Sequence, residues 1–259
     1  MLKELVKSLP GYDFLYLGDN ARTPYGTRSF NVVYEYTLEA VKYLFSQNCH
    51  LIIIACNTAS AKALRNIQQL DLPKIAPDGR VLGVIRPSVE KVAEITSNGH
   101  VGVLGTVGTV ISESYPIELE KWSDGKVKST VQEACPMWVP IVENNVVDTP
   151  GADYFIQSNL KSLFEKDPTI DSLILGCTHY PLLIDSIRKF MPKEGVQIIE
   201  QGKIVAGKLS DYLHRHPEIE AVCSKNATRK FYTTEEARFF ESRAQQFLGY
   251  SIQAEKIEL

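Results

Sequence analysis

LILGCTHYPLL, residues 173–183, begins as an apolar run and changes character at a cysteine. The run is continuous rather than alternating, which is typical of a parallel strand buried on both faces. Cys177 ends this strand, and Thr178 and His179 follow it directly. Residues 179–191 then carry the pattern of a helix. The stretch therefore predicts a buried strand, a polar turn that contains a cysteine, and a helix.

A second stretch, LIIIACNTAS at residues 51–60, follows the same plan. It is an apolar strand that stops at Cys56, and Asn57 and Thr58 lead into a predicted helix. Each cysteine is therefore expected at the carboxyl end of its own parallel strand. In open α/β sheets this end is where ligands bind. Both cysteines are thus candidates for a functional site.

Strands and helices alternate along almost the whole chain, which indicates an α/β protein with mostly parallel sheets. No low-complexity segment divides it, and we expect two lobes. The predicted strands cover residues 12–17, 49–55, 80–85, 100–105, 128–136, 171–177 and 195–202.

The composition argues against several classes of protein. The 259 residues carry a net charge of -3 and no long basic run, so neither nucleic acid nor an anionic membrane surface is an expected partner. The longest apolar run, residues 51–56, is far shorter than the roughly 20 residues of a membrane-spanning helix. The first residues lack the apolar stretch of a signal peptide, so we expect a cytoplasmic protein.

The cysteine content also limits the chemistry. The chain has five cysteines, an odd number, and no two of them have C-x-x-C spacing. Neither a disulfide framework nor a zinc knuckle fits this pattern, and reduced thiols are the simplest interpretation. Cys177 and His179 are also poor partners within one metal-ligand set, so no metal is expected.

Three further interpretations of Cys56 and Cys177 stay open at this point. A free cysteine at the end of a buried strand is often an inert part of the core. A hydrolase could use Cys177 as nucleophile with His179 as base, although Cys56 would then have no role. A proton-transfer enzyme would use both thiols, one on each face of a carbon atom, with the pKa of each thiol drawn toward the working pH. A helix N-terminus, expected after each cysteine, lowers a thiol pKa.

Six blocks in a fixed order carry a family resemblance. The chain resembles bacterial glutamate racemases from about Tyr12 to its C-terminus, which includes a similar ending, YTTEEARFFESRAQQFLG. The resemblance implies interconversion of L- and D-glutamate without a cofactor, which supplies D-glutamate for peptidoglycan. The blocks are YLGDNARTPYGTRS, ACNTAS, GVIRPSVE, VGVLGTVGTV, EACPMWVPIVE and LGCTHYPLL.

The resemblance also implies a fold and a set of site residues. It implies two Rossmann-like lobes with a cleft between them, lobe one from residues 1–80 plus 190–259 and lobe two from residues 81–189, and a homodimer. Asp19 and Arg22 lie in a loop where a structural and a functional role are equally expected. The implied catalytic residues are Cys56, Cys177 and His179, the implied substrate contacts are Tyr25, Gly26, Asn57, Thr58, Thr178 and His179, and Glu143 is an implied supporting residue.

The chain departs from the family at its start, where MLKELVKSL already has the pattern of a helix. The family's first strand and its loop with an Asp and a Ser have no counterpart, so we expect an N-terminally shortened chain. Loss of a central strand should leave backbone groups of neighbouring strands unpaired. Two alternatives follow for the function: a non-catalytic protein that binds an acidic amino acid, and a racemase of a related substrate such as aspartate.

Overall fold

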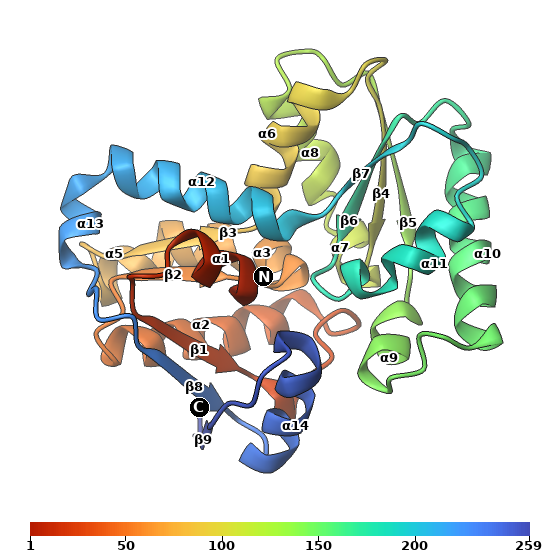
Figure 1. The fold of residues 1–259 in the computed structure, drawn as a ribbon. Helices are drawn as coiled ribbons and strands as arrows, with labels where there is room; N and C mark the ends of the chain where they lie inside the picture. Colours follow the sequence, from red (N-terminus) through yellow and green to blue (C-terminus); the bar gives the residue numbers. More distant parts are fainter.

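The computed structural model describes residues 1–259 as an α/β protein in which every paired strand is parallel to its neighbour. Two lobes are visible in Figure 1, and the predicted fold class is confirmed. The strands are β1 (Phe14–Gly18), β2 (Leu51–Ile54), β3 (Arg80–Gly83), β4 (His100–Gly105), β5 (Ser129–Ala134), β6 (Ser172–Gly176), β7 (Gln197–Ile199), β8 (Arg229–Thr233) and β9 (Glu255–Lys256).

The helices lie between these strands, as the alternating pattern predicted. They are α1 (Leu2–Ser8), α2 (Phe30–Ser46), α3 (Asn57–Lys62), α4 (Leu64–Asn66), α5 (Leu72–Ile75), α6 (Ile85–Ile95), α7 (Val107–Ile111), α8 (Ser114–Trp122), α9 (Trp138–Glu143), α10 (Pro150–Lys166), α11 (Ile184–Lys189), α12 (Gln201–Arg215), α13 (Pro217–Val222) and α14 (Ala237–Leu248). Short 3₁₀ turns cover Asn20–Arg22 and Tyr180–Leu183, and a π-helical segment covers Ile67–Asp71. No helix is long and apolar enough to span a membrane.

The larger sheet has the order β5-β4-β6-β7, and β6 is one of its two inner strands. All five residues of β6 are buried, which agrees with its continuous apolar sequence. Helices α9 and α10 contribute Trp138, Ile156 and Leu160 to the core on one face. Helices α6 and α8 contribute Val89 and Leu119 to the core on the other face. Cys177 is therefore held at the end of a strand that is covered on both sides.

The other lobe contains two smaller sheets, β1-β8-β9 and β2-β3. Strand β1 pairs only with β8, and β2 pairs only with β3, so each leaves one edge without a strand partner. Unpaired backbone groups in this lobe were an expectation from the sequence. Helix α12 runs from the end of β7 across this lobe and packs on α1 and α6 (Figure 1). The predicted boundaries of the lobes, residues 1–80 plus 190–259 and residues 81–189, stay a prediction.

Two helical predictions differ from the structure. The helix expected directly after Cys177 begins only at Ile184, because the 3₁₀ turn Tyr180–Leu183 comes first. Pro181 lies in this turn, and its ring favours a first turn over a helix interior. The helix expected after Cys56 is interrupted after Lys62 and continues as short helical and π-helical segments.

A carboxylate fixes the loop that enters β4. Asp171 accepts hydrogen bonds from the backbone N–H groups of Ser97 and Asn98, both at 2.7 Å, and from the hydroxyl group of Thr96 at 2.7 Å. Partial burial raises the pKa of Asp171, but these hydrogen bonds outweigh it and lower the pKa to about 2. The ionised carboxylate therefore stabilises the folded state.

Asp171→Asn is expected to lower the free energy of unfolding at pH 7 by about 1 kcal/mol, because the pKa falls to about 2 on folding but solvent screens this partly buried carboxylate. Because the folded-state pKa is depressed, the contribution is present above pH 4 and is lost as the pH falls toward 2. Urea unfolding of the wild type and the Asp171→Asn variant between pH 7 and pH 3 measures this contribution. Asp185→Asn is the control, because Asp185 is exposed. A difference that did not shrink on acidification would contradict the assignment.

Candidate active site

Cys56 lies at the point where β2 ends and α3 begins. It is the N-cap residue of α3 with extended backbone angles, φ -131° and ψ 124°. Burial raises the pKa of its thiol to about 11, although the backbone N–H groups of Ala59 and Thr58 oppose this effect. The helix N-terminus therefore lowers the pKa as expected, but burial is the stronger influence. In the absence of substrate, Cys56 is a protonated thiol at neutral pH.

Cys177 lies directly after β6, and its side chain is the first member of a chain of polar contacts. Its sulfur is 3.8 Å from Nδ1 of His179, and Nε2 of the same ring is 2.6 Å from Oε1 of Glu143. The guanidinium group of Arg243 donates to Oε2 of Glu143 at 3.1 Å. Glu143 ends α9, whereas Arg243 lies on α14, so the contacts join two distant parts of the chain.

His179 is the charged centre of this chain of contacts. Burial alone would lower its pKa, but the hydrogen bonds to Cys177 and Glu143 outweigh burial and raise the pKa to about 10. The hydrogen bond from His179 in turn lowers the pKa of Glu143. At neutral pH the ring is therefore an imidazolium between the sulfur and a carboxylate. It supplies the counter-ion that a thiolate at Cys177 requires.

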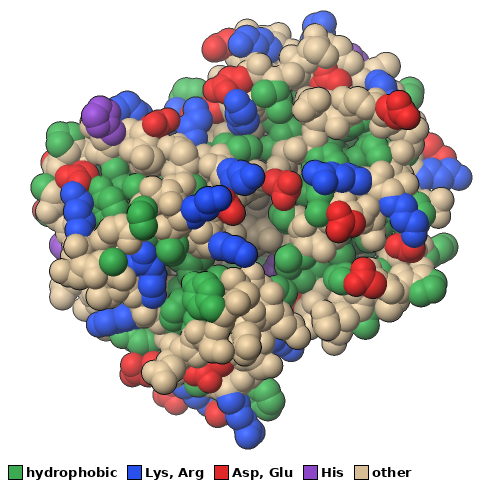
Figure 2. Space-filling view, viewed as in Figure 1, with side chains coloured by type: hydrophobic (Ala, Val, Ile, Leu, Met, Phe, Trp, Pro, Cys, Tyr) green, Lys and Arg blue, Asp and Glu red, His purple; other side chains and the backbone are tan.

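The two thiols belong to one site. Tyr115 contacts the neighbours of both cysteines, since its hydroxyl group bonds to Asn57 and its ring lies against Gly176, and a charge on Cys177 raises the pKa of Cys56. The sequence analysis predicted one site for Cys56 and Cys177 from two stretches that are far apart in the chain, and their joint role stays a prediction. Figure 2 shows a hollow near the middle of the face viewed, with Lys and Arg side chains around it.

Tyr25 and Gly26 form a wall next to Cys56. The Tyr25 hydroxyl group donates to Asp19, whose carboxylate also accepts from Thr234 at 2.9 Å. Burial, and then the bond to Asp19, raise the pKa of Tyr25, so its hydroxyl group stays protonated. A Cβ atom at Gly26 would lie 2.8 Å from Cβ of Thr106, so this position accepts no side chain without movement. Asp19 thus supports the wall through Tyr25.

Hydroxyl groups connect the two lobes beside this wall. Thr58 Oγ1 lies 2.9 Å from Thr106 Oγ1, which lies 3.0 Å from Thr109 Oγ1. The backbone N–H of Gly108 donates to the carbonyl oxygen of Gly26 at 2.7 Å. The start of α3 and the start of α7 are therefore joined directly. Thr106 and Thr109 were not among the predicted site residues, although Thr106 follows β4 as Cys177 follows β6.

Asn57 and Thr178 occupy different surroundings, although both follow a cysteine. Thr178 is partly exposed between Cys177 and His179, where a ligand could reach its hydroxyl group. The side chain of Asn57 is only 2% exposed and bonds to Gln201 and Tyr115. It therefore faces a buried seam between helices, and only its backbone is left to face the cysteines.

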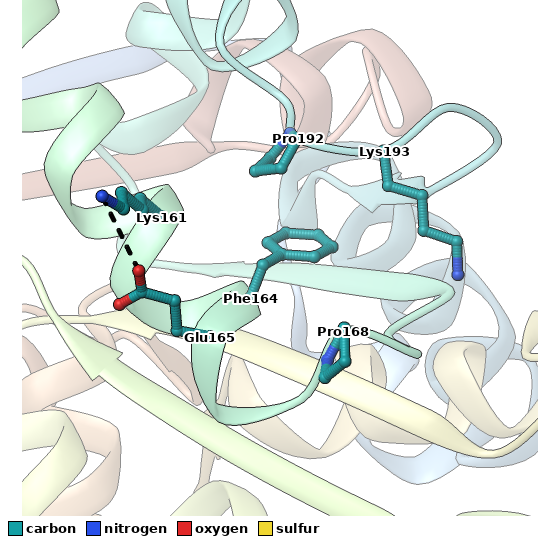
Figure 3. A pocket seen from close by; sticks show the side chains of 6 residues that line it. All are labelled: Lys161, Phe164, Glu165, Pro168, Pro192 and Lys193. Atoms are coloured by element: carbon teal, nitrogen blue, oxygen red, sulfur yellow. Dashed lines mark ion pairs between the residues drawn. The ribbon is translucent and has the colours of Figure 1, made fainter.

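Other features of the surface lie apart from these residues. A shallow cavity of about 250 Å³ is lined by Phe164 of α10 and by Pro168, Pro192 and two lysines, and contains none of the predicted site residues (Figure 3). No three His, Cys, Asp or Glu side chains converge in an arrangement that could hold a metal ion. The group formed by Cys56, Cys177 and His179 is thus the candidate site for a chemical reaction.

Comparisons with known proteins agree with this geometry. The Asp/Glu/Hydantoin racemase family matches residues 1–209. A curated glutamate racemase of Persephonella marina is 37% identical over 100% of this chain and 92% of the relative. The chain belongs to the Asp/Glu/Hydantoin racemase family. It is therefore an isomerase, and the predicted family is confirmed.

Solved structures of relatives share the whole fold. The glutamate racemase isoform RacE1 from Bacillus anthracis has a TM-score of 0.88 and 35% identity, and the match covers 100% of this chain and 92% of that chain. The glutamate racemase from Francisella tularensis, solved in complex with D-glutamate, has a TM-score of 0.85 and 30% identity, with coverage of 99% and 92%. These family members are similar to this chain across both lobes.

Proposed function

We propose that this protein interconverts L-glutamate and D-glutamate without a cofactor, by proton transfer at Cα between two cysteines. The observation that carries the proposal is that Cys56 and Cys177 follow β2 and β6, whose ends are joined by Tyr115 through its bond to Asn57 and its packing on Gly176. Relatives named glutamate racemase support glutamate as the substrate. Inversion of a stereocentre needs one group on each face of the carbon, and two opposed thiols meet this need.

The different surroundings of the two thiols define their starting states. Cys56, with a pKa of about 11, begins as the proton donor. Cys177, whose sulfur is 3.8 Å from Nδ1 of His179, acts as the base that removes the α-proton on its own face. The proton then comes from Cys56 on the opposite face, which leaves Cys56 as thiolate and Cys177 as thiol. The other enantiomer is processed by the reverse sequence.

The substrate carboxylates would be bound by groups at the rim of the site. The N-terminal N–H groups of α3 suit the α-carboxylate, since helix starts favour anions. Thr178 and the wall made by Tyr25 and Gly26 supply further polar contacts. Asn57 contributes through its backbone, because its side chain is held by Gln201.

The wider role follows from the same activity. D-glutamate is a component of peptidoglycan, and supply of this component is the proposed role in the cell. The homodimer that the family resemblance implies stays a prediction. The predicted cytoplasmic location stays a prediction.

A test of the proposed function is to incubate the reduced protein with L-glutamate or D-glutamate in D₂O. Proton NMR measures the loss of the α-proton signal, and circular dichroism measures inversion. We expect deuterium at Cα from both enantiomers and a final racemic mixture. L-aspartate serves as the control substrate, and its α-proton should exchange much more slowly than that of glutamate. A folded, reduced sample that exchanged neither glutamate enantiomer would contradict the proposal and favour a binding protein.

A further inference from the structure

Four buried polar side chains meet where the two lobes join, and none of them faces solvent. We call them the seam cluster: Asn57 of α3, Ser88 of α6, Tyr115 of α8 and Gln201 of α12. Ser88 and Tyr115 are fully buried, and Asn57 and Gln201 are 2% exposed. Figure 1 shows these helices meeting near the middle of the molecule, and α12 and α3 both contact α6.

The hydrogen bonds of the seam cluster fix the direction of each donor. The Tyr115 hydroxyl group donates to Oδ1 of Asn57 at 2.7 Å, and Nδ2 of Asn57 donates to Oε1 of Gln201 at 2.6 Å. Nε2 of Gln201 lies 2.8 Å from both the Tyr115 oxygen and the Ser88 oxygen, which it serves as donor. Burial raises the pKa of Tyr115, so the hydroxyl group keeps its proton at any working pH.

Tyr115 also contacts the end of β6, the strand that precedes Cys177. Gly176, the last residue of β6, precedes Cys177, and a Cβ atom placed on it would lie 3.1 Å from Cε2 of Tyr115. The ring therefore packs directly over the backbone that leads to Cys177. The hydroxyl group of the same side chain bonds to Asn57, the residue after Cys56. One rigid side chain thus spans the two strand ends that carry the thiols.

We propose that Tyr115, with its hydroxyl group held by Gln201, is a positioning residue that sets the separation of Cys56 and Cys177. This inference rests on the two-cysteine racemase activity proposed above. Proton transfer to opposite faces of one carbon requires both sulfur atoms at a fixed distance from it. A misplacement of about 1 Å can cost roughly 10²-fold in rate. A buried phenol that bridges the two strand ends satisfies this requirement without contact with the substrate.

The distinguishing measurement is the ratio of deuterium exchange to inversion. After one thiol removes the α-proton, the carbanion takes a proton either from the same thiol or from the opposite thiol. Return from the same side gives exchange with retention once the thiol proton has been replaced by a deuteron from solvent, and delivery from the opposite side gives inversion. A lower amount of correctly folded protein reduces both rates by the same factor and leaves the ratio unchanged. A change in thiol separation raises the ratio.

Tyr115→Phe is the test variant, because it keeps the ring over Gly176 and removes only the hydroxyl group, with its bonds to Asn57 and Gln201. We expect inversion of glutamate to fall about 10- to 100-fold and exchange to fall less, so that the ratio rises at least several-fold for one enantiomer. Gln201→Met, which removes the bonds to Asn57 and Tyr115 with little change in volume, should change the ratio in the same direction. Rates are followed by proton NMR in D₂O together with circular dichroism.

Thr37→Ala is the matched control for stability. Its buried hydroxyl group donates to the carbonyl oxygen of Val33 at 2.6 Å within α2, apart from the seam cluster. Thr37→Ala should have a Tm close to that of Tyr115→Phe. Its ratio of deuterium exchange to inversion should equal that of the wild type. If the wild type is active, two results for Tyr115→Phe would overturn the positioning role. One is a fall in the exchange and inversion rates by the same factor, and the other is no change in either rate. A wild type without exchange would overturn the racemase proposal and this inference together.

Discussion

Replacement of either Cys56 or Cys177 by serine is expected to lower the rate of glutamate inversion by roughly 10³-fold or more. A hydroxyl group does not form an alkoxide at working pH, so it can neither remove the α-proton nor be regenerated as a base. Each variant retains one thiol, however, and that thiol can still remove a proton from its own side. Exchange with retention should therefore survive for one enantiomer in each variant.

The two serine variants should retain opposite enantiomers. Cys56→Ser keeps Cys177 and His179, so it should exchange the enantiomer that presents its α-proton to Cys177. Cys177→Ser should exchange only the other enantiomer. The measurement is deuterium uptake from L-glutamate and D-glutamate in separate reactions, together with inversion by circular dichroism. Near-native inversion by either variant would show that the assignment of two bases is wrong.

Cys49→Ser provides the matched control for these variants. Cys49 is a free, partly buried cysteine before β2, and it packs against the core cluster of this lobe. The same atom is replaced, but no contact with the site is lost. Inversion should stay near the wild-type rate. Loss of activity in this control would point to general sensitivity of the fold to removal of a thiol.

His179→Gln is expected to lower inversion by about 10²-fold at neutral pH. The imidazolium ring, with its pKa of about 10, is the counter-ion of the Cys177 thiolate, and glutamine keeps a hydrogen-bond donor without the charge. The charge is present below this pKa and is lost as the pH rises through about 10. The ratio of the wild-type rate to the variant rate should therefore fall over that range. Initial rates from neutral pH to above the His179 pKa measure it.

The control for this experiment is His214→Gln, because His214 is an exposed residue of α12. Its rate should match that of the wild type at every pH. Glu143→Gln should act in the same direction as His179→Gln but less strongly, since it weakens the imidazolium without removal of the ring. A ratio for His179→Gln that did not change with pH would show that the ring acts only through its shape.

The sequence predicted the parts of the fold that depend on local patterns. The apolar runs before Cys56 and Cys177 led to the correct strands, since a parallel strand buried on both faces needs a continuous run of apolar residues. The position of each cysteine after its strand followed from the same pattern. The interruption after Lys62 and the turn at Pro181 were missed, because helix boundaries depend on tertiary contacts as much as on propensity.

The missed site residues show where local patterns end. Thr106 and Gln201 each follow a strand closely, so the rule that identified Cys56 would also have identified them. Tyr115 gives no such signal, because an aromatic residue within a helix has the pattern of an ordinary core residue. Arg243 lies 100 residues from Glu143 in the chain, and only the folded structure brings them together. Side-chain pairing over such separations is not encoded in periodicity.

The unequal surroundings of the two thiols have a thermodynamic consequence. L- and D-glutamate have the same free energy in water, so their equilibrium constant is unity. The value of kcat/KM must then be equal in the two directions, however different the environments of Cys56 and Cys177 are. The asymmetry between a thiol with a pKa of about 11 and a sulfur paired with an imidazolium can only be expressed in kcat and KM separately. The direction with the higher turnover must also have the proportionally higher KM.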